Sequence, residues 1–323
     1  MSEQGGGFRM VLALAGDTML GRGVAEQIAE HNELFSDDVY ALARRADLFV
    51  LNLECCISDR GQRWPDTRKP FFFRAPPRAV DVLAGLGVDC VTLANNHALD
   101  YGREALLDTL HHLEGAGIAV VGAGADDVAA REPALVAAGD ATVAVVAATD
   151  HPADFAAGGG EPGVAYANLK EGVPEWLTES TTSLEADVVL VTPHWGPNMV
   201  SHPVPHVLRA ADALRHSGAA LVAGHSAHVV QGAHARVLFD LGDFIDDYAV
   251  DPLMRNDLGM FFLVTIEDGG PTLLEAVPLK LDYCYTRLAE GFDAELIAHR
   301  FLESSTALGS DAWESDGRVL VRL

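Results

Sequence analysis

Short apolar runs of this sequence, each the length of a β-strand, end in side chains that could do chemistry. The residues that follow these runs are Asp17 after 11–16, Glu54 after 48–53, Asn95, Asn96 and His97 after 90–94, His194 after 188–192, His225 and His228 after 220–223, and Asp243 after 237–241. In open α/β sheets the carboxyl ends of the strands converge on one crevice. We therefore expect these side chains to meet at one edge of a sheet.

The side chains in this set are of the kinds that bind divalent metal ions. Carboxylate and amide oxygens and imidazole nitrogens suit Mn, Fe, Zn or Mg, and the lack of thiolates among them argues against a structural zinc site. There are enough candidate ligands for one ion or two. Two ions about 3.5–4 Å apart, bridged by a carboxylate, clamp an in-line displacement and generate hydroxide near neutral pH. The pattern therefore predicts a hydrolytic metal centre.

Each of these residues alone has a simpler explanation. A lone Asp after a strand, such as Asp17, is commonly a turn or helix-cap residue, and a lone histidine is commonly a hydrogen-bonded structural residue. His225 and His228 are three apart beside a glycine, which lets both face one site. His97 is either a ligand or a proton donor, since histidine titrates near neutral pH. His151 is the nearest rival and stays outside the predicted set.

The elements that must position these residues alternate between apolar runs and amphipathic stretches. One stretch, 103–114, carries an apolar helical face formed by Leu106, Leu107, Leu110 and Leu113. This alternation predicts an α/β fold in which helices cover a sheet. The late strands 261–266 and 273–280 follow one another closely, which predicts antiparallel pairing on that side. We expect one main domain over residues 8–288 and a small helix-and-strand appendage over 289–323.

The composition excludes some classes of partner. The chain has 323 residues and a formal net charge of −25, which argues against nucleic acid because nothing offsets phosphate repulsion. Its lysines are Lys69, Lys170 and Lys280, so arginine supplies most of the positive charge. Acid-rich, lysine-poor surfaces suit a high-salt cytoplasm, where self-repulsion is screened. A genome of high GC content explains the same composition, and both explanations stay open.

The cysteines and the N-terminal residues bear on the compartment. Cys55, Cys56, Cys90 and Cys284 lack the spacing of a disulfide framework or a zinc site, so we expect reduced, buried thiols. The apolar stretch 10–15 is too short for a signal peptide or a membrane span, and no basic segment precedes it. We expect a cytoplasmic protein without a membrane anchor. The oligomeric state is left open.

Several motifs occur in an order that is similar to that of a known family. They are Gly16-Asp17-Thr18-Met19-Leu20-Gly21-Arg22, Asn52-Leu53-Glu54, Phe73-Arg74-Ala75-Pro76, Leu93-Ala94-Asn95-Asn96-His97-Ala98-Leu99-Asp100-Tyr101-Gly102, His194-Trp195-Gly196, Gly224-His225 with His228, and Leu241-Gly242-Asp243-Phe244. The chain resembles the CapA poly-γ-glutamate capsule biosynthesis family, a relative of the calcineurin-like metallophosphoesterases. The resemblance covers roughly residues 8–281.

The resemblance implies a metallophosphatase-like four-layer α-β-β-α sandwich with mixed sheets. By analogy with the phosphoesterases, the metal ligands would be Asp17 on one ion, Glu54 as the bridge, Asn96 on the other ion, and His194, His225 and His228 completing the two sets. His97 would assist the leaving group. The substrate-binding residues would be Asn95, Arg22, Arg74 and Trp195, because Arg offers a bidentate fork to carboxylate or phosphate. A surface ion pair is the alternative for each arginine.

Two functions follow from this resemblance. The first is a metal-dependent hydrolase, in which metal-activated water attacks a phosphoester or an amide of a small or polymeric anionic substrate. The second is a non-catalytic factor in poly-γ-glutamate synthesis, export or binding. Met19 stands where the phosphoesterases have a histidine, so one of their ligands is absent from this chain. An acidic protein that binds an acidic polymer needs cations between them, so both functions require bound metal.

Overall fold

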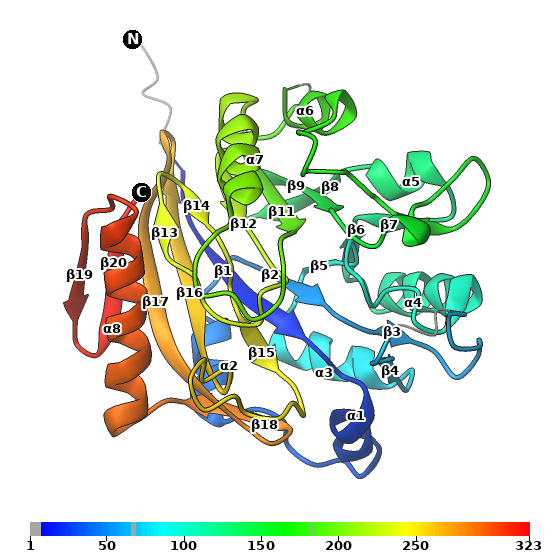
Figure 1. The fold of residues 1–323 in the computed structure, drawn as a ribbon, viewed down its shortest axis with the longest axis horizontal. Coiled ribbons are helices and arrows are strands. Elements are labelled where there is room, and N and C mark those ends of the chain that lie inside the picture. The colour runs from blue at the N-terminus through cyan, green and yellow to red at the C-terminus, as the bar shows by residue number, and fades with distance from the viewer. Residues whose placement is uncertain (1–7, 66–68, 183) are drawn as a thin grey trace.

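The computed structural model describes residues 8–65, 69–182 and 184–323. Two β-sheets pack face to face, and helices cover their outer faces (Figure 1). This arrangement confirms the predicted four-layer α-β-β-α sandwich with mixed sheets. Among the described residues, no helix combines the length and the apolar character that a membrane span requires.

The larger sheet has ten strands within the described ranges. Its main path runs β19 (Ala312–Ser315), β20 (Arg318–Arg322), β17 (Gly270–Asp282), β16 (Leu258–Glu267), β1 (Arg9–Thr18), β2 (Leu48–Leu53), β5 (Cys90–Thr92) and β6 (Ala119–Val121). β15 (Asp243–Ile245) pairs with β1, and β18 (Tyr285–Leu288) pairs with β17. The strands β1, β2, β5 and β6 are parallel, whereas β16, β17 and β20 pair in antiparallel fashion. The antiparallel pairing predicted for the late strands is therefore confirmed.

The smaller sheet has six strands within the same ranges. Its order is β13 (Ala233–His234), β14 (Val237–Leu238), β12 (Leu221–Ala223), β11 (Val188–His194), β9 (Ala141–Thr149) and β8 (Ala134–Ala138). Its central strands β14, β12, β11 and β9 are parallel. Two short pairs lie apart from the sheets: β3 (Cys56–Ile57) with β4 (Arg74–Ala75), and β7 (Ala123–Gly124) with β10 (Gly163–Val164).

The alternation of side chains along each strand separates three apolar cores. In β1, Leu12 and Leu14 point into the core between the sheets, whereas Ala13 and Ala15 face the helices. The helices on the larger sheet are α1 (Arg22–Ala29), α2 (Asp37–Ala43), α3 (Ala79–Leu86) and α4 (Gly102–Gly115). Those on the smaller sheet are α6 (Glu175–Thr182) and α7 (Pro205–His216), and α5 (Asp127–Arg131) packs on β7 and β10.

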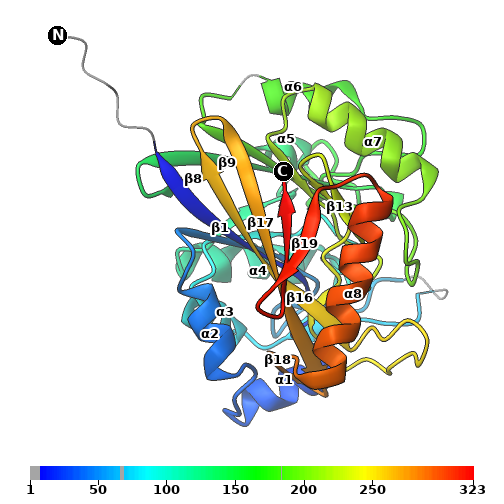
Figure 2. The ribbon, with the colours of Figure 1, turned by 90° about the vertical axis from the view of Figure 1, so that its left-hand side faces the viewer.

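The C-terminal segment extends the larger sheet. Helix α8 (Gly291–Ala307) is followed by β19 and β20, and Figure 2 shows the helix lying along that edge of the sandwich. Phe301 and Val321 are buried in the core between the sheets. The segment therefore shares its core with the rest of the chain, and the boundary at residue 289 stays a prediction.

Several strand boundaries differ from the sequence expectation. Asp17 and His194 lie inside β1 and β11 and not after them, and Asp243 lies in the short strand β15. The pairing of β1 shifts register between Ala15 and Asp17 and again at Thr18. A bulge of this kind bends a strand and redirects its side chains, which carries Asp17 toward the ends of the neighbouring strands.

Candidate metal centre

The backbone around Asp17 passes very close to a second strand end. A Cβ atom on Gly16 would lie 1.8 Å from the carbonyl oxygen of Gly242, so only glycine fits there. The amide of Asp17 donates to that same carbonyl at 2.8 Å. This contact brings the ends of β1 and β15 together, and with them Asp17 and Asp243.

A cluster of acidic and imidazole groups forms where these strands end. One ligand atom from each of Asp17, Glu54, His228 and Asp243 lies within 4.8 Å of the others, and all four residues are buried. The Nδ1 atom of His228 lies 2.8 Å from Oδ1 of Asp243, 3.3 Å from Oδ2 of Asp17 and 3.9 Å from Oε2 of Glu54. We call these four residues the metal cluster.

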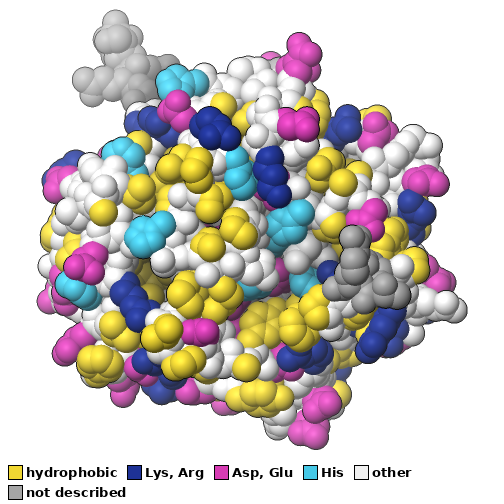
Figure 3. Space-filling view, viewed as in Figure 1, with side chains coloured by type: hydrophobic (Ala, Val, Ile, Leu, Met, Phe, Trp, Pro, Cys, Tyr) yellow, Lys and Arg dark blue, Asp and Glu magenta, His cyan; other side chains and the backbone are white. Residues whose placement is uncertain are grey.

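Two further histidines contact the metal cluster from the smaller sheet. Nε2 of His194 lies 3.5 Å from Oε1 of Glu54, and Nδ1 of His225 lies 3.3 Å from Oδ1 of Asp17. The backbones of His194 and His225 form a parallel bridge, which sets the two rings side by side at the ends of β11 and β12. The cluster therefore joins both sheets of the sandwich. Histidine side chains gather around a hollow near the middle of the face in Figure 3.

Many polar atoms of this site are buried without a hydrogen-bond partner in the described structure. They are Oδ2 of Asp17, both carboxylate oxygens of Glu54, Oδ2 of Asp243, both ring nitrogens of His194 and Nδ1 of His225. Unpaired buried polar atoms are costly, and buried charges are normally paired or coordinate a metal. Oxygen and nitrogen donors of this kind fit Mn, Fe, Zn or Mg. The residues present therefore fit a bound divalent cation.

The pKa values of the cluster reflect burial and crowded charge. Burial, reinforced by the charge of Asp17, raises the pKa of Glu54 well above its ordinary value. Burial would also raise the pKa of Asp17, but the close contact with His225 and the charges of nearby histidines outweigh it, so the pKa falls. Burial would lower the pKa of His228, but Asp243 and Glu54 raise it well above its usual value. The carboxylates of Asp17, Glu54 and Asp243 thus share too little positive charge from the nearby histidines, and a bound cation would supply more.

The loop that carries His225 and His228 is held in a strained conformation. Ser226 and His228 have φ angles of 112° and 58°, in the left-handed region that residues with a side chain rarely adopt. The buried carboxylate of Asp240 accepts hydrogen bonds from the amides of Ala227 at 2.8 Å and Gly242 at 2.9 Å. Asp240 therefore ties the histidine loop to the turn that precedes Asp243.

A chain of buried amides supports Asp17. Nδ2 of Asn52 donates to Oδ1 of Asp17 at 2.8 Å, and Nδ2 of Asn95 donates to Oδ1 of Asn52 at 2.9 Å. Asn95, expected to bind substrate, is fully buried and also accepts from the His97 amide at 3.0 Å. Asn96 lies beside this chain, and its Oδ1 atom is buried without a partner among the described residues. No described contact joins Asn96 to the metal cluster.

His97 lies in a closed environment. Its Nδ1 atom is 2.6 Å from Oδ2 of Asp100, and its ring stacks on Phe73 with centroids 4.1 Å apart. Asp100 also pairs with Lys69 at 3.0 Å. Burial lowers the pKa of His97 to about 4, although Asp100 acts in the opposite direction. Asp100 holds the proton on Nδ1, which leaves Nε2 as a hydrogen-bond acceptor at neutral pH.

The remaining predicted substrate residues lie in different settings. Arg22 pairs at 2.6 Å with Asp247, whose side chain is buried. Arg74 lies 4.1 Å above the Tyr101 ring and half-exposed. Trp195 is buried in the outer core and donates its indole N–H to the carbonyl of Phe239 at 2.9 Å. No described contact joins Trp195 to the metal cluster.

Sequence reasoning left some residues of the site out of its ligand set. Asp243 carried a signal, since it follows a glycine after an apolar run, but it was not chosen. Asn52 stood in the Asn52-Leu53-Glu54 motif without an assigned role, and Asp240 carried no signal, because their roles depend on partners far away in the chain. The buried Asp150 pairs with the partly exposed His151, whose ring lies 5.0 Å from that of His194.

Comparison with known proteins places this site in a family. The family model described as "Bacterial capsule synthesis protein PGA_cap" matches residues 11–248, which span every residue of the metal cluster. The chain belongs to this capsule synthesis family. The predicted resemblance to CapA proteins is thereby confirmed.

Curated relatives of this CapA-family chain carry matching names. A "Probable polyglutamine synthesis accessory protein" of Mycobacterium tuberculosis is 30% identical, over 93% of this chain and 92% of that protein. The "Capsule biosynthesis protein CapA" of Bacillus anthracis is 25% identical, over 98% and 78% of the two chains. The "PGA biosynthesis protein CapA" of Bacillus subtilis is 28% identical, over 73% and 63%.

Solved structures resemble the CapA-family fold more distantly. A Thermus thermophilus protein without assigned function has a TM-score of 0.49 at 15% identity, covering 84% of this chain and 99% of its own. A 5′-nucleotidase of Candida albicans has a TM-score of 0.41 at 9% identity, covering 94% and 59%. Both scores are low, so these likenesses carry no inference about chemistry.

Proposed function

We propose that this CapA-family protein is a metal-dependent hydrolase that cleaves a phosphoester or an amide bond in an anionic substrate. The observation that carries the proposal is the set of buried, unpartnered oxygens and nitrogens on Asp17, Glu54, Asp243, His194 and His225. The names of the relatives support poly-γ-glutamate, an amide-linked polymer of carboxylates, as the substrate to examine first.

The residues of the site divide into those that hold cations and those that support them. Asp17, Glu54, His228 and Asp243 would hold one divalent ion, with His194 and His225 contributing from the smaller sheet. A bound divalent cation, with manganese the first to try, would polarise the scissile group and lower the pKa of water. The buried, unpartnered Oδ1 of Asn96 would serve a second ion as a further part of the proposal.

His97 is the proposed proton-transfer residue. Because Asp100 holds the proton on Nδ1, proton exchange with a substrate would take place at Nε2. The lowered pKa keeps the imidazole neutral at neutral pH, so Nε2 accepts a proton before it can protonate a leaving group. Arg22 and Arg74 would contact the negative charge of the substrate, and Asn95 would act by orienting Asn52 and the His97 backbone.

Metal analysis followed by a turnover assay tests the proposal. Purified protein should retain or take up a divalent cation, and with Mn²⁺ it should hydrolyse γ-linked oligoglutamate or generic phosphomono- and diesters. Asp17→Ala and His225→Ala should abolish both metal uptake and turnover. The matched controls are Asp212→Ala and His299→Ala, whose side chains are 64% and 65% exposed. Metal binding without turnover on any of these substrates would contradict the hydrolase and favour a binding role.

The predicted cytoplasmic location belongs to the proposal as well. Fractionation of host cells followed by immunoblotting would check it. Recovery of the protein in the membrane or the medium would contradict it.

A further inference from the structure

The structure contains a pocket of unusual charge for so acidic a protein. Its volume is about 370 Å³. The described residues that matter in its lining are three arginines and three aromatic residues: Arg22, Arg63, Arg74, Phe71, Phe72 and Tyr101. The chain as a whole carries a formal net charge of −25, with only 22 Lys and Arg residues. Three guanidinium groups at one pocket therefore make a local positive charge on a protein whose overall charge is strongly negative. We call it the arginine pocket.

Two arginines of this pocket, Arg63 and Arg74, contact aromatic rings, whereas Arg22 pairs with Asp247 at 2.6 Å. The guanidinium of Arg74 lies 4.1 Å from the Tyr101 ring centroid, and that of Arg63 lies 5.3 Å from the Phe72 ring. Among the described residues, neither has a carboxylate partner. Stacking on a ring fixes the guanidinium plane and leaves N–H groups at its edge for an acceptor. One N–H of Arg74 already donates to the carbonyl of Arg60 at 3.2 Å, and its other donors remain for a ligand. An anionic oxygen group is the ligand that such an edge recognises.

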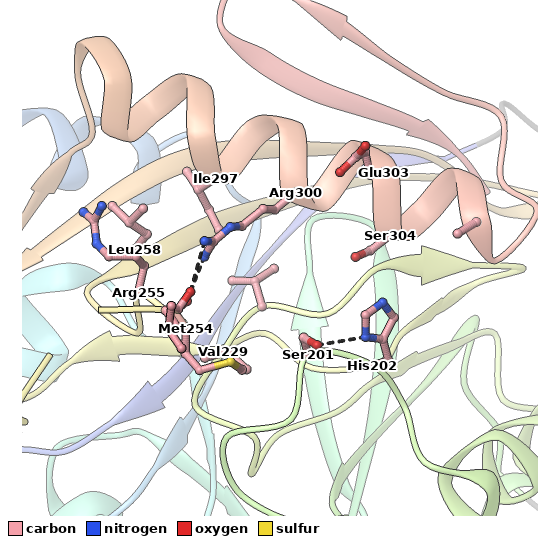
Figure 4. Close-up of a pocket in the computed structure, with 13 residues that line it drawn as sticks. Ser201, His202, Val229, Met254, Arg255, Leu258, Ile297, Arg300, Glu303 and Ser304 are labelled. Atoms are coloured by element: carbon pink, nitrogen blue, oxygen red, sulfur yellow. Dashed lines mark hydrogen bonds between the residues drawn. The ribbon is translucent and has the colours of Figure 1, made fainter. Parts of the chain in front are cut away.

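Another pocket shows what arginines look like when they are already engaged. It is lined by Arg255 and Arg300, among others, beside helix α8 (Figure 4). Arg300 donates to the carbonyl of Met254 at 2.8 Å, and Arg255 pairs with Asp257 and Asp293, each at 2.7 Å. Those arginines serve the fold, because their donors are already bonded. This contrast favours the arginine pocket as the place where an anion binds.

A layer of two aromatic rings connects the arginine pocket to the metal cluster. The guanidinium of Arg22 lies 5.5 Å from the Phe73 ring and 5.8 Å from the Tyr248 ring. Phe73 also stacks on His97 at 4.1 Å, and Tyr248 meets the His228 ring edge-on at 5.6 Å. The pocket and the cluster are therefore linked through these two rings.

We propose that the arginine pocket is a subsite for a second carboxylate of the same substrate chain whose scissile bond lies at the metal cluster. The inference rests on the proposed function and adds to it a second binding position for a polymeric substrate. A monomer can occupy only one of the two positions, whereas an oligomer can occupy both. Affinity should therefore rise with oligomer length, and the increase should depend on Arg63 and Arg74.

Binding of labelled γ-linked oligoglutamates of increasing length tests this subsite. Fluorescence anisotropy with Mn²⁺ present, extrapolated to the moment of mixing, separates binding from cleavage. Arg63→Gln and Arg74→Gln should each weaken oligomer binding about tenfold, the loss of one charged hydrogen-bonded contact. Arg63→Gln should leave glutamate monomer binding unchanged. The oligomer affinity of Arg74→Lys should lie between those of the wild type and Arg74→Gln, because lysine keeps the charge but cannot form the bidentate hydrogen bond. Arg215→Gln, beside a different pocket, is the matched control.

The outcomes separate this inference from the function on which it rests. Oligomer binding that depends on the two arginines but is not followed by turnover would support the subsite and contradict the proposed hydrolase activity. Turnover with oligomer affinity that is indifferent to both arginine changes would overturn the subsite. Inorganic phosphate at low concentration would compete only if the pocket prefers a phosphoryl group. Displacement of the oligomer by such phosphate, lost in Arg74→Gln, would therefore contradict the carboxylate subsite. Circular dichroism and thermal unfolding of each variant ensure that the fold is intact.

Discussion

His228 and Asp243 form the shortest of the His228 contacts within the metal cluster, with Nδ1 of the histidine 2.8 Å from Oδ1 of the carboxylate. His228 reaches this position from left-handed backbone, with a φ angle of 58°. Asp243 reaches it from β15, which pairs with the end of β1 beside Asp17. The pair therefore joins a strained loop to the larger sheet, at a point where buried carboxylates already lie close together.

A divalent cation should stabilise the protein strongly. The carboxylates of Asp17, Glu54 and Asp243 lie close together, each with a buried oxygen that lacks a hydrogen-bond partner, and they repel one another when no cation is bound. At a Mn²⁺ concentration one hundred times the dissociation constant, the free energy of unfolding should rise by about 2.7 kcal/mol. Urea unfolding with and without a chelator measures this change, and an identical midpoint in both conditions would contradict the metal centre.

Asp243→Asn should separate metal affinity from stability. The amide removes one of the crowded negative charges, so the chelated variant should be as stable as the wild type or more stable. Burial already raises the pKa of Asp243 well above its usual value, the sign expected when the charged form is disfavoured. Metal affinity should fall at least about tenfold. Calorimetric titration with Mn²⁺ measures it, and unchanged affinity would show that Asp243 is not a ligand.

Asp240→Asn should damage the histidine loop without touching the proposed ligands. One of the two backbone amides, of Ala227 or Gly242, loses its buried acceptor, which should cost about 1–3 kcal/mol of unfolding free energy. Metal affinity should fall as well, since this loop carries His225 and His228. Asp212→Asn, an exposed change on α7, is the control. Lower stability with unchanged metal affinity would limit Asp240 to a structural role.

His97 should make the stability of the chelated protein depend on pH. Burial lowers its pKa in the folded state to about 4, below the ordinary value of 6.5. Between these values the unfolded chain binds the proton and the folded chain does not, so stability rises with pH through this window. The contribution is on the order of 3 kcal/mol.

The variant His97→Gln should lose this part of the pH dependence. Urea unfolding of wild type and variant across the window from about pH 4 to 6.5, with a chelator present, isolates the difference. His299→Gln, with an exposed side chain, should keep the wild-type profile. Parallel curves for wild type and His97→Gln would contradict a neutral, buried His97.

The thiols should be inert in the folded protein. All four cysteines are free and buried. Burial is the main cause that raises the pKa of Cys56 and Cys90 to about 12 and that of Cys284 to about 11, and it raises the pKa of Cys55 as well. Because the thiolate is the reactive form, iodoacetamide at about pH 8 should label the protein only after unfolding in urea. Rapid labelling of the native protein would contradict this.

Much of the layer architecture could be predicted from local pattern. The apolar period of 103–114 predicted a helix that the structure has as α4, and the closely spaced late strands predicted the antiparallel pairs of β16 and β17. Asp17, Glu54 and the histidines at 194, 225 and 228 were found by their positions at strand ends, and their side chains lie in contact in the structure. Local periodicity reports secondary structure directly, because backbone geometry alone sets it.

Only the tertiary structure decided how these side chains meet. The partner of His228, the burial of Asn95 and Trp195, and the pairing of Arg22 with Asp247 depend on strands that lie next to each other only after folding. By itself, the sequence determined which residue types stand at the strand ends. Strand order, the bulge at Asp17 and the left-handed backbone at His228 determined which of them share a cation site, since contacts between distant segments follow from packing and not from local spacing.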